Sequence, residues 1–335
     1  MKKLSIKKLS DYLGKVVDHN IQSSLMIWGA PGIGKSSVVE AVAKKKDIEL
    51  IDLRISQLAP TDLRGIPVPK DDKAYWYPPE FLPTSGKGIL FLDEINMAPP
   101  AVQGIAQQLI LDRKVGSYSV PDGWFIWSAG NRKEDFAAVF DMPAPLANRF
   151  IHLEVNTGLE EFKEYALKNK IDDRIISFLN FRPNYLHKIN KNSPSWPSPR
   201  SWDIADSLLK ADLDIDPAIG EACASEFRSY CKVYLSLPDI PSILAGKKKP
   251  EFPKDLSARY ALTCALAVRA KDVKEVENAF LYLDAKGSME WLSQCTYEVV
   301  TKWKDSKMSA QLVDMITKNK KLLDVADKLQ KLLAA

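Results

Sequence analysis

The sequence is poor in the residues that most often bind metals or carry redox chemistry. Its 335 residues include only three histidines and four cysteines, and no two cysteines have C-x-x-C spacing. The histidines have no carboxylate or cysteine at metal-ligand spacing, so no chemistry is assigned to His19, His152 and His187. The cysteines fall in helical patterns, where cysteine packs as a small apolar residue; they are Cys223, Cys231, Cys264 and Cys295.

Long apolar runs and a strong charge imbalance are also missing. No run approaches the roughly 20 residues that span a bilayer, and residues 1–8 lack the apolar segment of a signal peptide. We therefore expect a cytoplasmic protein with no membrane partner. The formal charge of +4, with lysines scattered or in short runs, argues only weakly for nucleic acid as a partner. Length and composition fit a globular protein of two or three domains.

What the sequence does contain is a glycine-rich loop between an expected strand and an expected helix. Residues 29–36 read Gly-Ala-Pro-Gly-Ile-Gly-Lys-Ser and fit the phosphate-binding pattern G-x-x-x-x-G-K-[ST]. The run 24–28 predicts a buried strand and residues 37–43 predict a helix, so the phosphates of a nucleoside triphosphate would lie at a helix N-terminus. A chance match in a glycine-rich turn is the alternative, and the flanking elements disfavour it. The predicted ATP-binding residues are Gly29, Pro31, Gly32, Ile33, Gly34, Lys35, Ser36 and Ser37.

A second apolar run, residues 88–94, ends in the two acids Asp93 and Glu94. It follows the phosphate loop as a Walker B strand does. There Asp93 would hold the Mg²⁺ shell beside Ser36, while Glu94 would orient and deprotonate the attacking water. The alternative is an exposed acidic pair that only closes a buried strand, and the upstream loop favours the catalytic interpretation.

A third apolar run, residues 124–130, is followed by Asn131. Open α/β sheets bind ligands at the C-terminal ends of their strands, so Asn131 is a candidate contact to the γ-phosphate or the attacking water. An asparagine after a glycine more often forms a turn when it stands alone. The order of the three motifs favours a place in the site.

In this order the motifs resemble those of AAA+ ATPases, most closely the MoxR branch, over roughly residues 20–205. Residues 93–100, Asp-Glu-Ile-Asn-Met-Ala-Pro-Pro, look like the Walker B segment of that branch, and Asn131 matches sensor 1. Residues 145–150, Pro-Leu-Ala-Asn-Arg-Phe, are similar to the arginine-finger segment, and residues 198–202 are similar to the sensor 2 motif. The resemblance implies catalytic roles for Glu94, Asn131, Arg149 and Arg200, and metal ligation by Ser36 and Asp93.

The arginine-finger resemblance of Arg149 has a consequence for assembly, because AAA+ rings supply this arginine from the neighbouring subunit. Arg149 would then act in trans, and catalysis would require a homo-oligomer. The alternative for Arg149 is an ordinary surface or salt-bridged arginine, and for Arg200 it is a helix-start arginine after Pro199.

Two segments resemble hairpins of this branch, one that the family inserts into its second helix and one that precedes sensor 1. The first covers about residues 61–83, with alternating apolar residues, prolines and a charged tip at 70–73. The second covers about residues 112–124, before sensor 1. The resemblance implies that the first hairpin faces substrate, and a hairpin that only packs on its own domain is the alternative.

The expected fold is an α/β P-loop NTPase core of AAA+ type with a parallel sheet, followed by an all-α lid and a helical C-terminal extension. We place the nucleotide-binding domain at 1–155, the lid at 156–235, and a linker with the extension at 236–335. Prolines and lysines between 238 and 253 have the composition of a linker. Residues 312–333 predict an amphipathic helix that packs in the lid, with partner or membrane-surface docking as the alternative.

The resemblance implies a MoxR-like AAA+ ATPase that works as a ring, by likeness a hexamer, to remodel or activate a protein client. It also implies a partner with a von Willebrand A-type domain. One alternative is a nucleic-acid-associated AAA+ motor, which the mixed charge of the hairpin tip and the lack of a recognisable DNA-reading module disfavour. Another is a nucleotide-gated scaffold, which has no need for Asp93, Glu94 and Asn131.

Overall fold

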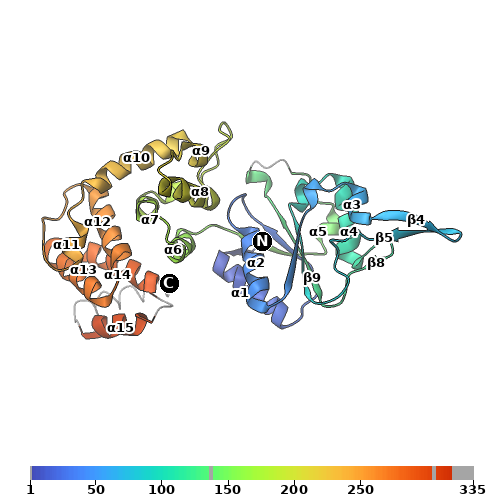
Figure 1. Cartoon of the computed structure of the whole chain (residues 1–335), viewed down its shortest axis with the longest axis horizontal. Helices are drawn as coiled ribbons and strands as arrows, with labels where there is room; N and C mark the ends of the chain where they lie inside the picture. Colours follow the sequence, from blue (N-terminus) through green and yellow to red (C-terminus); the bar gives the residue numbers. More distant parts are fainter. Residues whose placement is uncertain (1, 136–138, 304–306, 319–335) are drawn as a thin grey trace. The chain divides into compact units, whose positions relative to one another are not determined.

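The structure is a computed structural model that describes residues 2–135, 139–303 and 307–318. The chain forms two compact units, Met1–Gly158 and Leu159–Ala335. Figure 1 shows a sheet flanked by helices in the first unit and helices alone in the second. The expected α/β core followed by a helical region is confirmed.

The sheet of the first unit has six strands in the order β1-β10-β2-β9-β6-β3, and every neighbouring pair is parallel. Helices cover both faces of the sheet, so β9 is buried along its whole length and β6 is buried up to its last residue, Asp93. Parallel strands place their C-terminal ends at one edge, where open sheets bind ligands. The strands are β1 (Lys2–Leu4), β2 (Leu25–Trp28), β3 (Glu49–Arg54), β6 (Gly88–Asp93), β9 (Trp124–Gly130) and β10 (Ile151–Val155).

Two hydrophobic cores fill the two faces of this sheet. Alternate residues of a strand point to opposite faces, so Leu25 and Ile27 of β2 join one core while Met26 joins the other. The first core packs against α1 (Ile6–Asp18) and α2 (Lys35–Lys46). The second packs against α3 (Pro60–Arg64), α4 (Pro100–Asp112) and α5 (Ala144–Ala147). Short 3-10 helices follow three of the strands: η1 (Ile55–Gln57), η2 (Ile95–Met97) and η3 (Lys133–Asp135).

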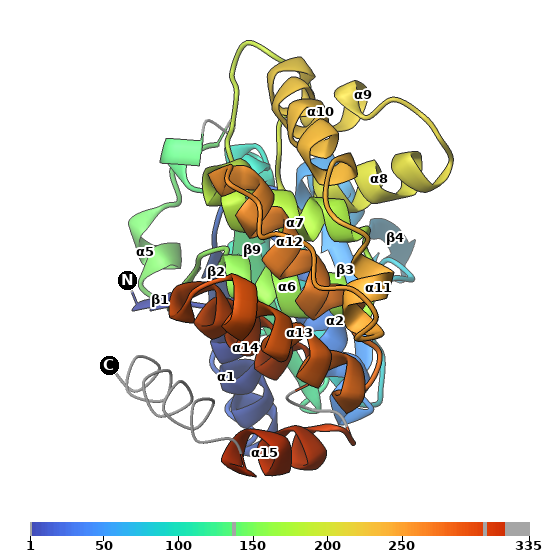
Figure 2. The same cartoon turned by 90° about the vertical axis from the view of Figure 1, so that its left-hand side faces the viewer.

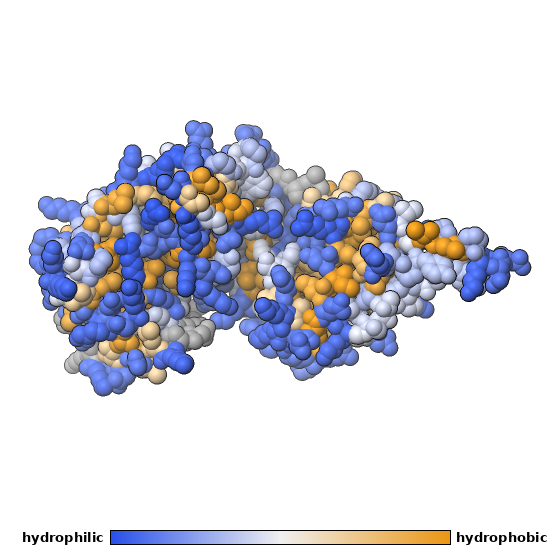
Figure 3. All heavy atoms as spheres, viewed as in Figure 1, coloured by the Kyte–Doolittle hydropathy of each residue, from blue (hydrophilic) through white to orange (hydrophobic). Residues whose placement is uncertain are grey.

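Two antiparallel hairpins leave this core, one within each of the ranges 61–83 and 112–124. The longer pairs β4 (Ile66–Lys70) with β5 (Lys73–Tyr77), and the shorter pairs β7 (Lys114–Val115) with β8 (Tyr118–Ser119). They contact one another, since Ser117 Oγ donates a hydrogen bond to the Trp76 carbonyl. Figure 3 shows apolar residues on the long hairpin and a hydrophilic tip. Its exposed apolar side chains are Ile66, Val68, Tyr75 and Tyr77.

The second unit contains only helices and has one core to which all of them contribute. Helix α12 lies at its centre, packed against α7, α10, α11, α13 and α14 (Figure 2). The helices are α6 (Leu159–Lys168), α7 (Asp173–Phe181), η4 (Pro183–Tyr185), α8 (Pro199–Lys210), α9 (Asp216–Ile219), α10 (Glu221–Leu235), α11 (Ile240–Leu244), α12 (Leu256–Arg269), α13 (Val273–Lys286), α14 (Met289–Trp303) and α15 (Ser309–Lys318).

The proline-containing segment 238–253 differs from the expected linker. It forms α11, and Ile240, Ile243 and Leu244 are buried in the shared core. Pro241 lies in the first turn of this short helix, and the helix packs against α12 and α13. Of the expected helix at 312–333, the structure describes residues up to 318, within α15, and the rest lies outside the described residues. Among the helices of the described residues, none has the length and apolar character needed to cross a membrane.

Candidate nucleotide-binding site

The glycine-rich loop 29–36 joins β2 to α2 at the C-terminal edge of the sheet. Helix α2 begins at Lys35, and Gly34 before it is left-handed with φ +92°, a conformation that costs glycine little. At Gly29 the chain runs close to β10, because a Cβ there would lie 3.0 Å from the carbonyl oxygen of Val155. The loop therefore has backbone geometry that requires its glycines, with a helix N-terminus behind it.

The lysine of this loop is 8% exposed and is held by three oxygens. Lys35 Nζ donates to the carbonyls of Gly29 at 2.8 Å and Ala30 at 3.0 Å, and to Asn131 Oδ1 at 2.9 Å. The last bond joins residues 96 positions apart in the sequence. The structure thus brings together the motif lysine and the asparagine that follows β9.

The serine of the loop meets the first acid of β6. Ser36 Oγ donates to Asp93 Oδ2 at 2.6 Å, and the other oxygen of Asp93 accepts from the Glu94 N–H at 2.8 Å. A hydroxyl and a carboxylate are hard oxygen ligands of the kind that Mg²⁺ prefers, so these two residues fit a magnesium site completed by phosphate and water. In residues 2–135, 139–303 and 307–318, no group of three or more His, Cys, Asp or Glu is arranged to hold a metal.

Glu94 follows the strand in a left-handed conformation, with φ +57° and ψ +32°. Its Oε2 accepts a hydrogen bond from Ser56 Oγ at 2.6 Å, so the carboxylate is held by η1 after the neighbouring strand β3. Asp52 on β3 is a third carboxyl group nearby, and burial together with the charge of Asp93 raises the pKa of Asp52. Neither Ser56 nor Asp52 belongs to a recognisable motif, and no sequence signal identified them.

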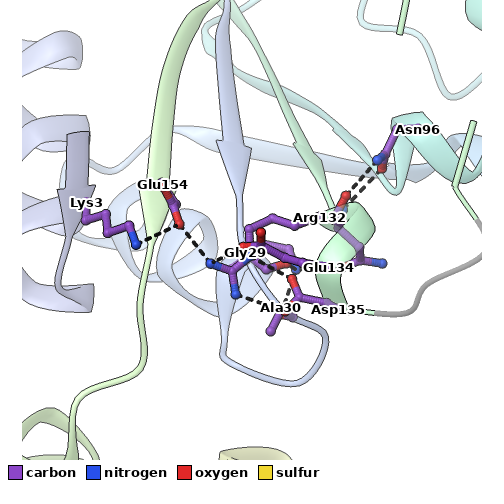
Figure 4. A network of polar contacts seen from close by, with 10 residues as sticks. Lys3, Gly29, Ala30, Asn96, Arg132, Glu134, Asp135 and Glu154 are labelled. Atoms are coloured by element: carbon purple, nitrogen blue, oxygen red, sulfur yellow. Dashed lines mark hydrogen bonds and ion pairs between the residues drawn. The ribbon is translucent and has the colours of Figure 1, made fainter. Parts of the chain in front are cut away.

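Asn131 is anchored by a second asparagine, Asn96 of η2. Asn96 Nδ2 donates to the Asn131 carbonyl at 2.7 Å, and the Asn131 N–H donates to Asn96 Oδ1 at 3.1 Å. Figure 4 shows Asn96 reaching the start of the loop that carries Arg132. A Cβ at Gly130 would lie 2.5 Å from Asn96 Oδ1, so this close approach requires glycine. Asn96 lies inside the segment 93–100 that carried the family resemblance, but no role was predicted for it.

Arg132, the residue after Asn131, connects the loop after β9 to β10, which lies two strands away in the sheet. Arg132 makes a bidentate pair with Asp135, with N···O distances of 2.7 and 2.9 Å, and a third bond to Glu154 Oε1 at 2.8 Å (Figure 4). The hydrogen bond with Asp135, and next that with Glu154, raise the pKa of Arg132 despite its partial burial. Glu154 is on β10, so the loop after β9 is fixed across β2 to that strand.

The two arginines predicted to reach the nucleotide are both exposed. Arg149 follows α5, and within the described residues no hydrogen bond or ion pair joins its guanidinium to another side chain or to the phosphate loop. Arg200 is in the second unit, on the first turn of α8, where the Ser198 hydroxyl caps the helix by accepting from the Ser201 N–H at 3.1 Å. The catalytic roles of both arginines stay predictions.

Comparison with known proteins agrees with the site at the sheet edge. Residues 24–142 match the family model described as AAA domain (dynein-related subfamily). This part of the chain is an AAA domain. It contains the phosphate loop, Asp93, Glu94 and Asn131, and it ends before Arg149 and Arg200.

Individual proteins show more distant similarity to this chain. A stretch of 161 residues, 45% of this chain, is 25% identical to Midasin from Giardia intestinalis, but it spans 3% of that protein's length. A solved RuvB mutant from Thermotoga maritima is 18% identical, covering 83% of this chain and 86% of that chain with a TM-score of 0.43. NtrX from Brucella abortus in complex with ATP is 15% identical, covering 85% of this chain and 64% of that chain with a TM-score of 0.40.

Proposed function

We propose that this chain is a MoxR-type AAA+ ATPase that acts in the cytoplasm as a hexameric ring and remodels a protein client. The proposal of ATP hydrolysis rests mainly on one observation: four predicted residues meet at one edge of the sheet. Lys35 bonds Asn131, and Ser36 bonds Asp93, across three strands that are far apart in the sequence. A phosphate cradle, a pair of magnesium ligands and a polar sensor in contact are the parts that phosphoryl transfer requires.

Each side chain has a task that follows from its position. The loop N–H groups and Lys35 bind the β- and γ-phosphates, while Ser36 and Asp93 would hold Mg²⁺, which neutralises phosphate charge when it is bound. Glu94 orients the attacking water and accepts its proton, and Asn131 positions the γ-phosphate or the same water. The hydrogen bond from Ser56 keeps the Glu94 carboxylate at the end of β6.

Arg149 supplies the remaining charge to a neighbouring subunit. Its exposed guanidinium, without a side-chain partner in the described residues, is free to enter the site of another copy. An arginine given in trans stabilises the transition-state charge and is worth about 10³-fold or more in turnover. Hydrolysis is therefore coupled to assembly.

The ring can be tested through the concentration dependence of turnover. We expect ATP turnover per molecule to rise with protein concentration as rings form, and Arg149→Ala to bind ATP while losing about 10³-fold or more in turnover. Sedimentation of the same samples reports whether assembly changes over that range. A turnover per molecule that stays constant while the protein passes from monomer to ring would contradict action in trans.

The client and a partner with a von Willebrand A-type domain can be sought with Glu94→Gln as bait. This variant should retain ATP without cleaving it, which prolongs the client-bound state. We expect a defined protein to co-purify from native lysate with ATP and to be lost when ATP is omitted. Retention of nuclease-sensitive nucleic acid with no protein would instead favour a nucleic-acid motor.

A further inference from the structure

A chain of hydrogen bonds connects the phosphate loop to the segment that carries Arg149. Trp28, the last residue of β2, lies directly before Gly29, and its Nε1 donates to His152 Nδ1 at 2.9 Å. The other ring nitrogen, His152 Nε2, lies 2.7 Å from the carbonyl oxygen of Ala147, the last residue of α5. The two ring planes are nearly parallel, with centroids 6.1 Å apart and an interplanar angle of 14°.

These contacts fix the protonation of the imidazole. An indole N–H can only donate, so Nδ1 of His152 must be the unprotonated nitrogen that accepts. The neutral ring then carries its proton on Nε2, which donates to the Ala147 carbonyl. One histidine therefore accepts from the strand that leads into the phosphate loop and donates to the end of α5.

Arg149 lies between Leu146 and Phe150, which are both buried in the second core of the sheet. Helix α5 is four residues long, and Arg149 is the second residue after it. The Arg149 N–H donates to Leu146 at 3.1 Å, and the Phe150 N–H reaches the Ala147 carbonyl at only 3.3 Å. Beside the burial of Leu146 and Phe150, the bond from His152 is a side-chain hydrogen bond that holds the main chain of this last turn.

We propose that His152 is a positioning residue for the arginine finger: through Ala147 it fixes Arg149 relative to the phosphate loop of its own chain. A change in the loop when nucleotide binds or leaves would pass through Trp28 and His152 to the finger that serves the neighbouring subunit. This inference rests on the proposed action of Arg149 in trans.

Rings mixed from two variants test the role of His152, because in them one subunit supplies the finger and a different subunit hydrolyses ATP. A Glu94→Gln chain supplies a finger but cannot turn over ATP, and an Arg149→Ala chain can turn over ATP only with a neighbour's finger. Each is expected to be inactive alone and the mixture active. If the mixture is inactive although mixed rings form, action in trans fails, and that failure is separate from any role of His152.

His152→Phe is then added to one chain at a time. Phenylalanine keeps an aromatic ring beside Trp28 but can neither accept from it nor donate to Ala147. In the Glu94→Gln chain it should lower the turnover of the mixture by about fivefold or more, and in the Arg149→Ala chain by less than about twofold. The second mixture shows that the variant folds, joins rings and hydrolyses ATP.

His152→Gln in the Glu94→Gln chain is the conservative variant. Its side-chain amide keeps an N–H that can reach Ala147, so it should restore at least about half of the turnover lost with phenylalanine. Equal losses on both sides of the mixture, or no loss on the finger side, would overturn the proposal.

Discussion

The Asn96 side chain bonds both main-chain polar groups of Asn131: it donates to the carbonyl at 2.7 Å and accepts from the N–H at 3.1 Å. Since Asn131 Oδ1 in turn accepts from Lys35, the buried Asn96 side chain fixes Asn131 beside the phosphate loop. The relationship is one of positioning, because Asn96 bonds only the main chain of its partner.

Replacing Asn96 with alanine should therefore impair hydrolysis more than binding. The change leaves a buried N–H and C=O without partners, at a cost of about 1–3 kcal/mol in the free energy of unfolding. If Asn131 has the proposed role, loss of its orientation should lower ATP turnover about tenfold, with ATP affinity within about threefold of the parent. Turnover and equilibrium binding measured on the same samples check both expectations.

Gln103→Ala is the matched control for Asn96→Ala. Gln103 is also a fully buried amide on the same side of the sheet, and its Nε2 donates to the Ala98 carbonyl at 2.9 Å. Its loss should reduce stability but leave turnover per folded molecule unchanged. Equal losses of turnover in both variants would mean that Asn96 contributes only to stability.

Ser36→Ala should raise the magnesium requirement. The Ser36 hydroxyl lies 2.6 Å from Asp93 and would be one of the two protein oxygens that hold the ion. We expect the Mg²⁺ concentration for half-maximal turnover at saturating ATP to rise about tenfold or more. Excess Mg²⁺ should recover part of the activity, and chelation should abolish turnover in the parent protein. An unchanged magnesium titration would exclude Ser36 as a ligand.

The helical unit contains a buried ion pair in which removal of either residue would leave the other charge buried without a partner of opposite sign. Lys163 and Glu298 are 1% and 3% exposed, their charged atoms are 2.7 Å apart, and Gln294 and Asn180 also donate to Glu298. Lys163→Met leaves an unpaired buried carboxyl and should cost about 3–5 kcal/mol in urea unfolding. The double change Lys163→Met with Glu298→Leu should recover most of that loss.

An exposed pair provides the comparison for this experiment. Lys274 and Glu277 lie 3.0 Å apart on the surface of α13, and Lys274→Met should cost less than about 1 kcal/mol. If the buried and exposed changes cost the same, Lys163 and Glu298 are not tightly coupled.

Lys302 should make stability rise at alkaline pH. Its Nζ donates to carbonyls at the end of α12, among them Val268 at 2.7 Å, and burial lowers the pKa of Lys302 from 10.5 to about 8. Between these values the unfolded chain binds a proton that the folded protein has released, so the contribution of Lys302 to the free energy of unfolding increases with pH. Urea unfolding at pH 8 and pH 10 should show this increase relative to Lys302→Met. A constant difference between the two proteins would contradict the lowered pKa.

Motifs that define a local backbone could be predicted from the sequence. The loop 29–36, the strand ending at Asp93 and the parallel sheet follow from patterns of neighbouring residues, and the structure has them where they were expected. The division into three domains and the catalytic roles of Arg149 and Arg200 stay predictions. The prolines and lysines of segment 238–253 are typical of a linker. Composition does not predict that α11, within this segment, packs into a core formed by distant helices.

The residues that support the site could not be predicted, because each one bonds a residue that is distant in the sequence and becomes a neighbour only when the chain folds. Ser56 and Glu94 are 38 positions apart, Asn96 and Asn131 are 35 apart, and Trp28 and His152 are 124 apart. Serine, asparagine and histidine in these places match no spacing rule. No carboxylate or cysteine lies at metal-ligand spacing from His152 in the sequence, and its bonds are to an indole and a carbonyl that only the fold brings near it.

ATP binding and ATP turnover of the wild-type protein and Glu94→Gln, measured side by side on assembled protein, test the central claim most directly. The account predicts that both bind ATP with dissociation constants within about threefold, while the variant turns over ATP about 10²-fold or more slowly. A variant that hydrolyses ATP at the wild-type rate, or a wild-type protein that binds no ATP, would contradict it.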